Sequence, residues 1–171
     1  GWCDGVAIIW YRNEIFRLNH IGDRNSGASM KQDEHKTFAR PVAEFSILTD
    51  EHIFRPCQPA AHKLFLRIWR QPAKTLPVFR DWWLTTMGPA LVNRLEAEGV
   101  CQGYIQNHAR LAGPDKAAKP LCDCVDEFCS VDAVACDSTI KSVFHSTPGV
   151  ADYSFDIKAV WTEETVLHDK P

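Results

Sequence analysis

Three features are missing from the sequence, and each absence narrows the possible functions. No run of about eighteen apolar residues occurs, so we expect no membrane partner and no segment that spans a membrane. Lys and Arg form no cluster and the net charge is −3, so the bulk charge does not indicate a nucleic-acid partner. No charged segment leads into an apolar core of the signal-peptide kind. We therefore predict a cytoplasmic protein.

The cysteines are numerous but do not form a recognisable framework. There are seven, an odd number, which favours free thiols in a reducing compartment. The four cysteines of the C-terminal half, at positions 122, 124, 129 and 136, lack the paired spacing typical of zinc sites. On one strand Cys124 and Cys129 would also point to opposite faces. We therefore expect no disulfide, no metal and no cofactor.

Residues 62–171 have the pattern of one complete α+β unit. Apolar and β-branched runs predict strands over 63–69, 101–108, 123–131 and 154–166. Between them, helical spacing predicts one helix from an N-cap at Thr75 to Gly99, kinked at Gly88-Pro89, and another over 133–145. A polar loop is expected at 113–120. The predicted order is β-α-β-β-α-β, the ferredoxin-like arrangement.

Residues 1–55 predict the trailing half of a second copy of this unit. The apolar run over 5–11 is typical of a strand, 19–30 of a loop, 33–40 of a short helix and 43–54 of a strand. Residues 56–61 predict a linker, since prolines cannot sit inside a sheet ladder. The β-α-β order and similar final strands suggest an internal repeat. We expect the chain to be an N-terminally truncated piece of a protein with two units.

Several segments resemble the EthD family of the dimeric α+β barrel superfamily. The segment 79–92 (FRDWWLTTMGPALV) resembles the first helix of that family, and 103–108 (GYIQNH) resembles its second strand. Residues 3–10 (CDGVAIIW) resemble its third strand, and Asp33-Glu34 with Phe38 resembles its last helix. The resemblance implies two ferredoxin-like sheets that face each other, either within one chain or in a homodimer. One departure is Met87, which stands where the family usually has a histidine.

The resemblance also implies a class of function. EthD-like proteins suggest a cofactor-independent enzyme that acts on a small apolar or aromatic metabolite by isomerisation, cyclisation, elimination or cofactor-free oxidation. The alternative is a non-enzymatic module that binds such a metabolite or assists a pathway, and Met87 favours this alternative because a thioether cannot carry a proton.

The candidate catalytic residues are His108 and Tyr104. On a strand, positions 104, 106 and 108 face the same side, so both side chains could enter a cleft between two sheets. A neutral imidazole could abstract a proton from a carbon acid, and the phenol could stabilise the oxyanion. Alternatively, His108 ends the strand in solvent and Tyr104 belongs to the core.

Aromatic residues and one amide are the candidates for binding substrate. Such side chains can line an apolar pocket, although ordinary core packing explains each of them as well. The predicted substrate-binding residues are Trp10, Trp69, Trp83 and Asn107.

Overall fold

The computed structural model describes residues 6–58, 60, 62–110 and 121–163. The chain divides into two compact units, Gly1–Ile47 and Leu48–Pro171, which are treated separately below. None of the helices in the described ranges has the length and hydrophobicity that crossing a bilayer requires. The predicted loop at 113–120 and the last residues of the predicted strand 154–166 lie outside these ranges.

The second unit is an α+β fold, and its predicted element order is confirmed. An additional strand precedes the predicted ones and joins the same sheet. In chain order the elements are β1 Thr49–Arg55, β2 His62–Arg70, α3 Leu76–Trp82, the π-helical segment η2 Trp83–Met87, α4 Gly88–Glu98, β3 Gly103–Ala109, β4 Cys124–Ser130, α5 Ala133–Ser146, α6 Val150–Tyr153 and β5 Ser154–Glu163.

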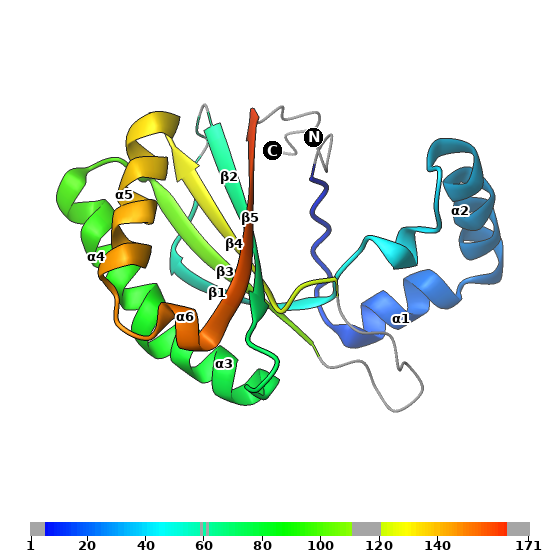
Figure 1. The fold of residues 1–171 in the computed structure, drawn as a ribbon. Helices are drawn as coiled ribbons and strands as arrows, with labels where there is room; N and C mark the ends of the chain where they lie inside the picture. The colour runs from blue at the N-terminus through cyan, green and yellow to red at the C-terminus, as the bar shows by residue number, and fades with distance from the viewer. Residues whose placement is uncertain (1–5, 59, 61, 111–120, 164–171) are drawn as a thin grey trace. The chain divides into compact units, whose positions relative to one another are not determined.

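The five strands form an open antiparallel sheet in the order β1-β3-β4-β2-β5. Helices α3, α4 and α5 lie on one face of this sheet (Figure 1). Register fixes which side chains meet these helices. Phe128 of β4 lies opposite Tyr104 of β3 and Leu64 of β2. All three are buried in the core between sheet and helices.

The long helix begins and ends as predicted, but its middle departs from α geometry. The Thr75 hydroxyl accepts a hydrogen bond from the Val78 N–H (3.5 Å), and Gly99 ends the helix at a φ of 65°. Between α3 and α4, the Gly88 N–H donates to the Trp83 carbonyl five residues earlier, the π pattern. The predicted kink region at Gly88-Pro89 therefore follows directly after an inserted π turn.

The first unit differs from its prediction. Residues 6–12 form neither helix nor strand, so the predicted strand over 5–11 is wrong for the described part. The predicted loop at 19–30 is instead helical, within α1 Glu14–Gly22 and α2 Arg24–Thr37. The Asn13 side chain caps α1 by accepting from the Phe16 N–H (2.9 Å), a local signal that the strand pattern had obscured.

The predicted strand at 43–54 is shorter and belongs to the second unit. Residues Val42–Glu44 form the 3-10 helix η1, and β1 begins only at Thr49. β1 pairs with β3, with Asp50 opposite His108 and His52 opposite Gln106. A register shift between Ile53 and Arg55 places Phe54 at a bulge.

Phe54 packs β1 against the helix layer at Gly88. Its ring stacks on Tyr104 (centroids 5.2 Å apart). A Cβ built on Gly88 would lie 2.1 Å from the Phe54 ring. The absence of a side chain at Gly88 therefore lets β1 approach the start of α4.

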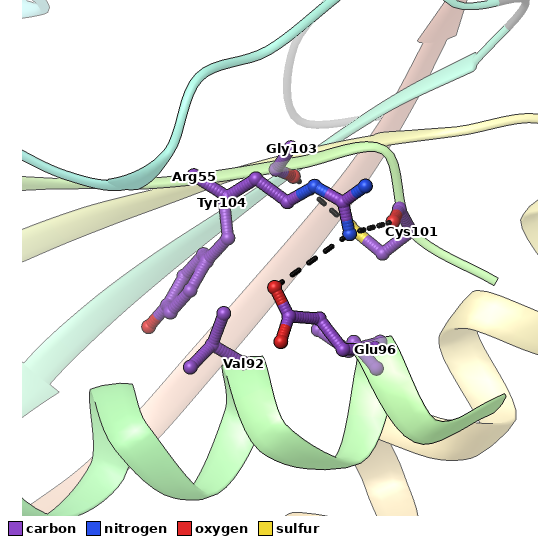
Figure 2. A pocket seen from close by; sticks show the side chains of 7 residues that line it. Arg55, Val92, Glu96, Cys101, Gly103 and Tyr104 are labelled. Atoms are coloured by element: carbon purple, nitrogen blue, oxygen red, sulfur yellow. Dashed lines mark hydrogen bonds and ion pairs between the residues drawn. The ribbon is translucent and has the colours of Figure 1, made fainter. Parts of the chain in front are cut away.

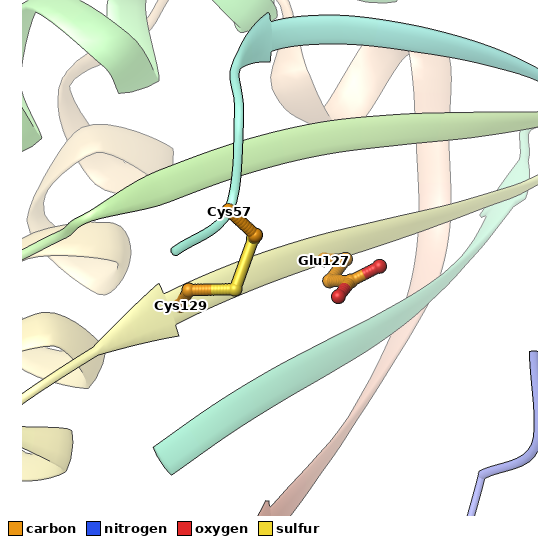
Figure 3. Close-up of side chains that lie close together, drawn as sticks. All are labelled: Cys57, Glu127 and Cys129. Atoms are coloured by element: carbon orange, nitrogen blue, oxygen red, sulfur yellow. A yellow bond between two sulfur atoms is a disulfide. The ribbon is translucent and has the colours of Figure 1, made fainter. Parts of the chain in front are cut away.

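A disulfide joins Cys57 to Cys129, so the prediction that all cysteines are free is wrong for this pair. It links the segment after β1 to β4, crossing β3 at Gly103 (Figure 3). Cys101, Cys122, Cys124 and Cys136 are free and buried. Spacing could not reveal the pair, because the two cysteines are 72 residues apart.

Replacing Gly88 with Ala is expected to destabilise the protein. The added methyl group would overlap the Phe54 ring, and such overpacking costs about 1–3 kcal/mol. Urea unfolding followed by circular dichroism measures the loss. The control is Gly22→Ala at the end of α1, where nothing lies within 4 Å of the added Cβ. Equal effects of the two substitutions would contradict the role assigned to Gly88.

Reducing the disulfide is expected to lower stability. The bond closes a loop with a sequence separation of 72 residues. Chain-entropy arguments give about 4 kcal/mol for a loop of this length. Urea unfolding of the oxidised protein, the reduced protein and the Cys57→Ser variant measures this contribution. An unchanged unfolding midpoint on reduction would refute it.

Candidate active site: a buried polar network

The strands β3 and β4 carry polar residues on the face that packs against the helices. On β3 these are Tyr104, Gln106 and His108, each at most 1% exposed. On β4, Cys124 and Asp126 lie in the same layer, with Asp126 opposite Gln106 and Cys124 opposite His108. A group of buried polar side chains in the centre of a core requires hydrogen-bond partners.

Asp126 is the centre of this network. Its carboxylate accepts from Trp83 Nε1–H (3.1 Å to Oδ2), from the Tyr104 hydroxyl (3.0 Å) and from the Cys124 thiol (3.2 Å). Trp83 belongs to the π segment, so this bond connects the helix layer with β4. The carboxylate thus has three neutral hydrogen-bond donors, and Asp126 is 0% exposed.

A directed chain of hydrogen bonds continues from Asp126 to His108. Gln106 Nε2 donates to the Tyr104 hydroxyl oxygen (2.6 Å) and to the Trp83 carbonyl (3.3 Å). Gln106 Oε1 then faces His108 Nε2 at 2.9 Å. Since the amide oxygen can only accept, Nε2 carries the proton and Nδ1 is left as the acceptor. Nδ1 is buried and has no hydrogen-bond partner among the described residues.

Burial controls the protonation of these groups. It raises the pKa of Asp126 to about 7, an effect that the bonds from Trp83, Cys124 and Tyr104 only partly offset. It also raises the pKa values of Tyr104 and Cys124 well above their ordinary ranges. The phenol and the thiol therefore remain protonated at neutral pH and act as donors.

His108 is the neutral end of the network. Burial, followed by the positive charge of Arg80, lowers the pKa of His108 to about 4, while Asp50 acts in the opposite direction. Asp50 lies opposite His108 on β1 and binds Arg80 (3.0 Å) and Arg110 (3.4 Å). An uncharged imidazole with an unpaired nitrogen is thus placed beside a surface ion cluster.

The predicted site residues fall into three groups. Tyr104, His108 and Trp83 meet in the buried network, but they face the helices, so the expected cleft between two sheets is wrong for them. Asn107 and Trp69 lie on the opposite face of the sheet, because strand neighbours alternate in direction. Trp10 lies in the first unit and is exposed.

Trp69 has a cationic environment on its face of the sheet. The Arg67 guanidinium lies 4.7 Å from its ring centroid, and Lys158 Nζ lies 5.3 Å away. Both are cation–π distances. These two cations beside the Trp69 ring would suit an anionic or polar neighbour better than a purely apolar substrate.

Asp126, Gln106 and Cys124 were not predicted. Adjacent acids, Asp126 and Glu127, occur in the middle of a strand that has neighbours on both sides. Alternation forces one of two adjacent side chains towards the helices. In a strand with neighbours on both sides, this pattern indicates a buried carboxylate, and the central position of β4 comes from the sheet order.

The pocket beside the network is smaller than a usual ligand site. The pocket at the Tyr104 end has a volume of about 160 Å³, including space open to solvent. Ligand pockets commonly exceed about 300 Å³. Arg55 covers it by binding Glu96 (3.7 Å) and the Cys101 carbonyl (3.4 Å) (Figure 2).

No protein-family model and no curated protein matches the chain. The resemblance to the EthD family therefore remains a prediction that depends on the quoted segments.

Replacing Asp126 with Asn is expected to change how stability depends on pH. The folded protein keeps a proton on Asp126 up to a pKa of about 7, whereas the ordinary pKa is 3.8. The contribution of Asp126 to stability should therefore fall as pH rises between these values and then level off, with a slope of at most about 1.4 kcal/mol per pH unit. Asn cannot ionise and lacks this contribution.

The measurement is the difference in unfolding free energy between Asp126→Asn and wild type at several pH values. The variant should gain on the order of 2 kcal/mol relative to wild type from pH about 5 to about 8. Asp81→Asn on the exposed side of α3 is the control and should show no such trend. A difference for Asp126→Asn that is constant with pH would refute the buried titration.

Proposed function

We propose that this protein is an EthD-like, cofactor-independent enzyme that moves a proton on a small apolar or aromatic metabolite. The observation that carries the proposal is the buried Nδ1 of His108, an acceptor with no hydrogen-bond partner in the described part of the chain. Leaving such an atom unpaired costs stability. A substrate proton delivered to it would supply the missing partner.

His108 is the proposed general base. Its neutral state and its fixed tautomer support this role, because the free lone pair on Nδ1 is available at neutral pH. The low pKa makes His108 a weak base, so the substrate must be an activated carbon acid, such as a carbon beside a carbonyl group. As Nδ1 takes the proton, Gln106 Oε1 and the Asp50 carboxylate favour the imidazolium.

Tyr104 and Asp126 are proposed as positioning residues. The Tyr104 proton is engaged by Asp126, and its oxygen accepts from Gln106. Gln106 is thereby held in the orientation that fixes the His108 ring. To stabilise an oxyanion as first expected, Tyr104 would have to exchange Asp126 for the substrate.

The finer fold assignment belongs to the same proposal. The β-α-β-β-α-β order and the strand order β3-β4-β2-β5 support a ferredoxin-like unit. In a dimeric α+β barrel, the face carrying Trp69 and Asn107 would meet a second sheet, from a homodimer partner or from a paired unit. A cytoplasmic location remains part of the proposal.

The second candidate function is a binding or accessory module without catalysis. The small pocket at Tyr104 supports it, since His108 is not among the residues that line this pocket. Met87 supports it as well, because this side chain is fully buried and apolar where the resembled family carries a histidine.

Deuterium exchange separates the two functions without knowledge of the final product. The protein is incubated in D2O with a panel of aromatic and aliphatic carbon acids, and loss of C–H signals is followed by proton NMR. The enzyme hypothesis predicts exchange at one acidic carbon of at least one compound. His108→Gln should reduce this exchange by about a hundredfold or more, the usual contribution of a general base.

The control for this experiment is His145→Gln on the exposed side of α5, which should leave exchange unchanged. Binding of a compound with chemical-shift changes but no exchange would favour the binding module. Exchange that survives in His108→Gln would remove His108 from the mechanism.

A further inference from the structure

A second group of reactive side chains lies on the sheet face opposite the polar network. The two sulfur atoms of Cys57 and Cys129 and a carboxylate oxygen of Glu127 all lie within 4.8 Å of one another. Figure 3 shows Glu127 projecting from β4 beside the disulfide. Cys129 and Glu127 are almost fully buried. Alternation along β4 places both on one face, with Asp126 on the other.

The local backbone allows Cys57 to lie beside Cys129 and Glu127. Pro56 precedes it and restricts the chain leaving β1. A Cβ on Gly103 would lie 2.4 Å from the Cys57 Cα, so only a glycine at this position of β3 lets the segment cross the strand. Gly103 is the direct partner of Cys129 in the β3–β4 register. The convergence therefore depends on three separate strands of the sheet.

We propose that reduction of the disulfide converts this cluster into a binding site for a thiophilic divalent cation, with zinc as the best fit. The ligands are the thiolates of Cys57 and Cys129 and the carboxylate of Glu127. Two sulfurs and one oxygen suit zinc, which commonly takes three protein ligands and one water. This inference is independent of the proposed proton-transfer function.

The geometry needs only a small rearrangement. Tetrahedral zinc–thiolate bonds of about 2.3 Å place two sulfurs roughly 3.8 Å apart. The Cα atoms of Cys57 and Cys129 lie 5.7 Å apart. Once the bond is broken, rotation of the two side chains about their Cα–Cβ bonds can bring the sulfurs to that separation. Glu127 already lies within reach of both.

The charges also balance. Lys63 Nζ lies 2.9 Å from Glu127 Oε1, and both side chains are largely buried. Two thiolates and one carboxylate bring three negative charges, which zinc and Lys63 together neutralise. A carboxylate has two oxygens, so the ion pair with Lys63 is compatible with metal binding through the other oxygen.

The chemical steps are a reduction followed by an exchange of protons for metal. A dithiol reductant gives two electrons and two protons to the S–S bond and is itself oxidised to a disulfide. A phosphine gives the same two thiols by taking up the oxygen of one water, whose protons go to the sulfurs, and is oxidised to its oxide. The products are the two free thiols of Cys57 and Cys129. Zinc then displaces both thiol protons as two Zn–S bonds form, and these protons go to the solvent.

Cobalt(II) titration of the full chain tests the site. The protein is reduced with a phosphine under anaerobic conditions, the reductant is removed, and cobalt is added as a spectroscopic substitute for zinc. We expect one equivalent to bind, with thiolate-to-cobalt charge transfer and the visible bands of tetrahedral cobalt. Zinc should displace it and raise the unfolding temperature of the reduced protein. The oxidised protein should bind none.

Variants assign the ligands. Cys57→Ser and Cys129→Ser should each abolish the charge-transfer signal of the bound ion. Loss of a residue that only hydrogen-bonds to a metal ligand already lowers metal affinity by about tenfold or more. Glu127→Gln should therefore weaken binding by at least that much. The control is Cys101→Ser, since Cys101 is a buried thiol near the same strands whose pKa is lowered to about 7, chiefly by a hydrogen bond with Cys136. It should bind cobalt as wild type does.

Three results would overturn the proposal. The first is a reduced wild-type protein that binds no cobalt and is not stabilised by zinc. The second is unchanged binding in Cys57→Ser or Cys129→Ser, which would place the metal on other thiols. The third is loss of binding in Cys101→Ser with retention in Glu127→Gln. Circular dichroism of each reduced variant separates loss of the site from loss of the fold, and zinc-induced refolding would itself support the site.

Discussion

The second unit depends on one buried carboxylate. Asp126 receives hydrogen bonds from Trp83 in the π segment, from Tyr104 on β3 and from Cys124 on its own strand. The hydrogen-bond donors that the described residues supply to this carboxylate are all neutral, so its burial is costly unless all three are in place. The Asp126 carboxylate therefore fixes the register between β3 and β4. It also fixes how closely the long helix approaches the sheet. Gln106 extends this control to the His108 ring.

The π segment is a consequence of the same packing. The five most deeply buried side chains of the long helix recur at intervals of four, at positions 79, 83, 87, 91 and 95. An ideal α-helix turns by about 40° too far at each such step, so this row would rotate away from the sheet. A wider turn at Trp83–Met87 returns the row to the core. The turn also presents the Trp83 carbonyl to Gln106.

Sequence patterns were sufficient where one rule dominated. The alternation in β5, the Thr75 cap and the Gly99 end predicted the elements of residues 62–163 closely. They failed in the first unit. The apolar run over 5–11 has the composition of a strand, and the polar residues at 19–30 have that of a loop although they lie within two helices. They also placed Tyr104 and His108 together correctly, but on the wrong side of the sheet. Which face meets the helices is decided by tertiary packing, which no local pattern contains.

Because β1 pairs with β3, the second unit begins at Leu48 and not after the predicted linker at 56–61. By sequence, the proline-rich residues 56–61 resemble a linker at which the chain would be divided. A fragment that began at His62 would nevertheless lack β1, Phe54 and Cys57. It would leave β3 as an open edge able to pair with other chains, and Tyr104 would lose its stacking partner. Excision, fusion or evolutionary exchange of this domain would therefore have to begin before Leu48, where contacts along the chain are sparse.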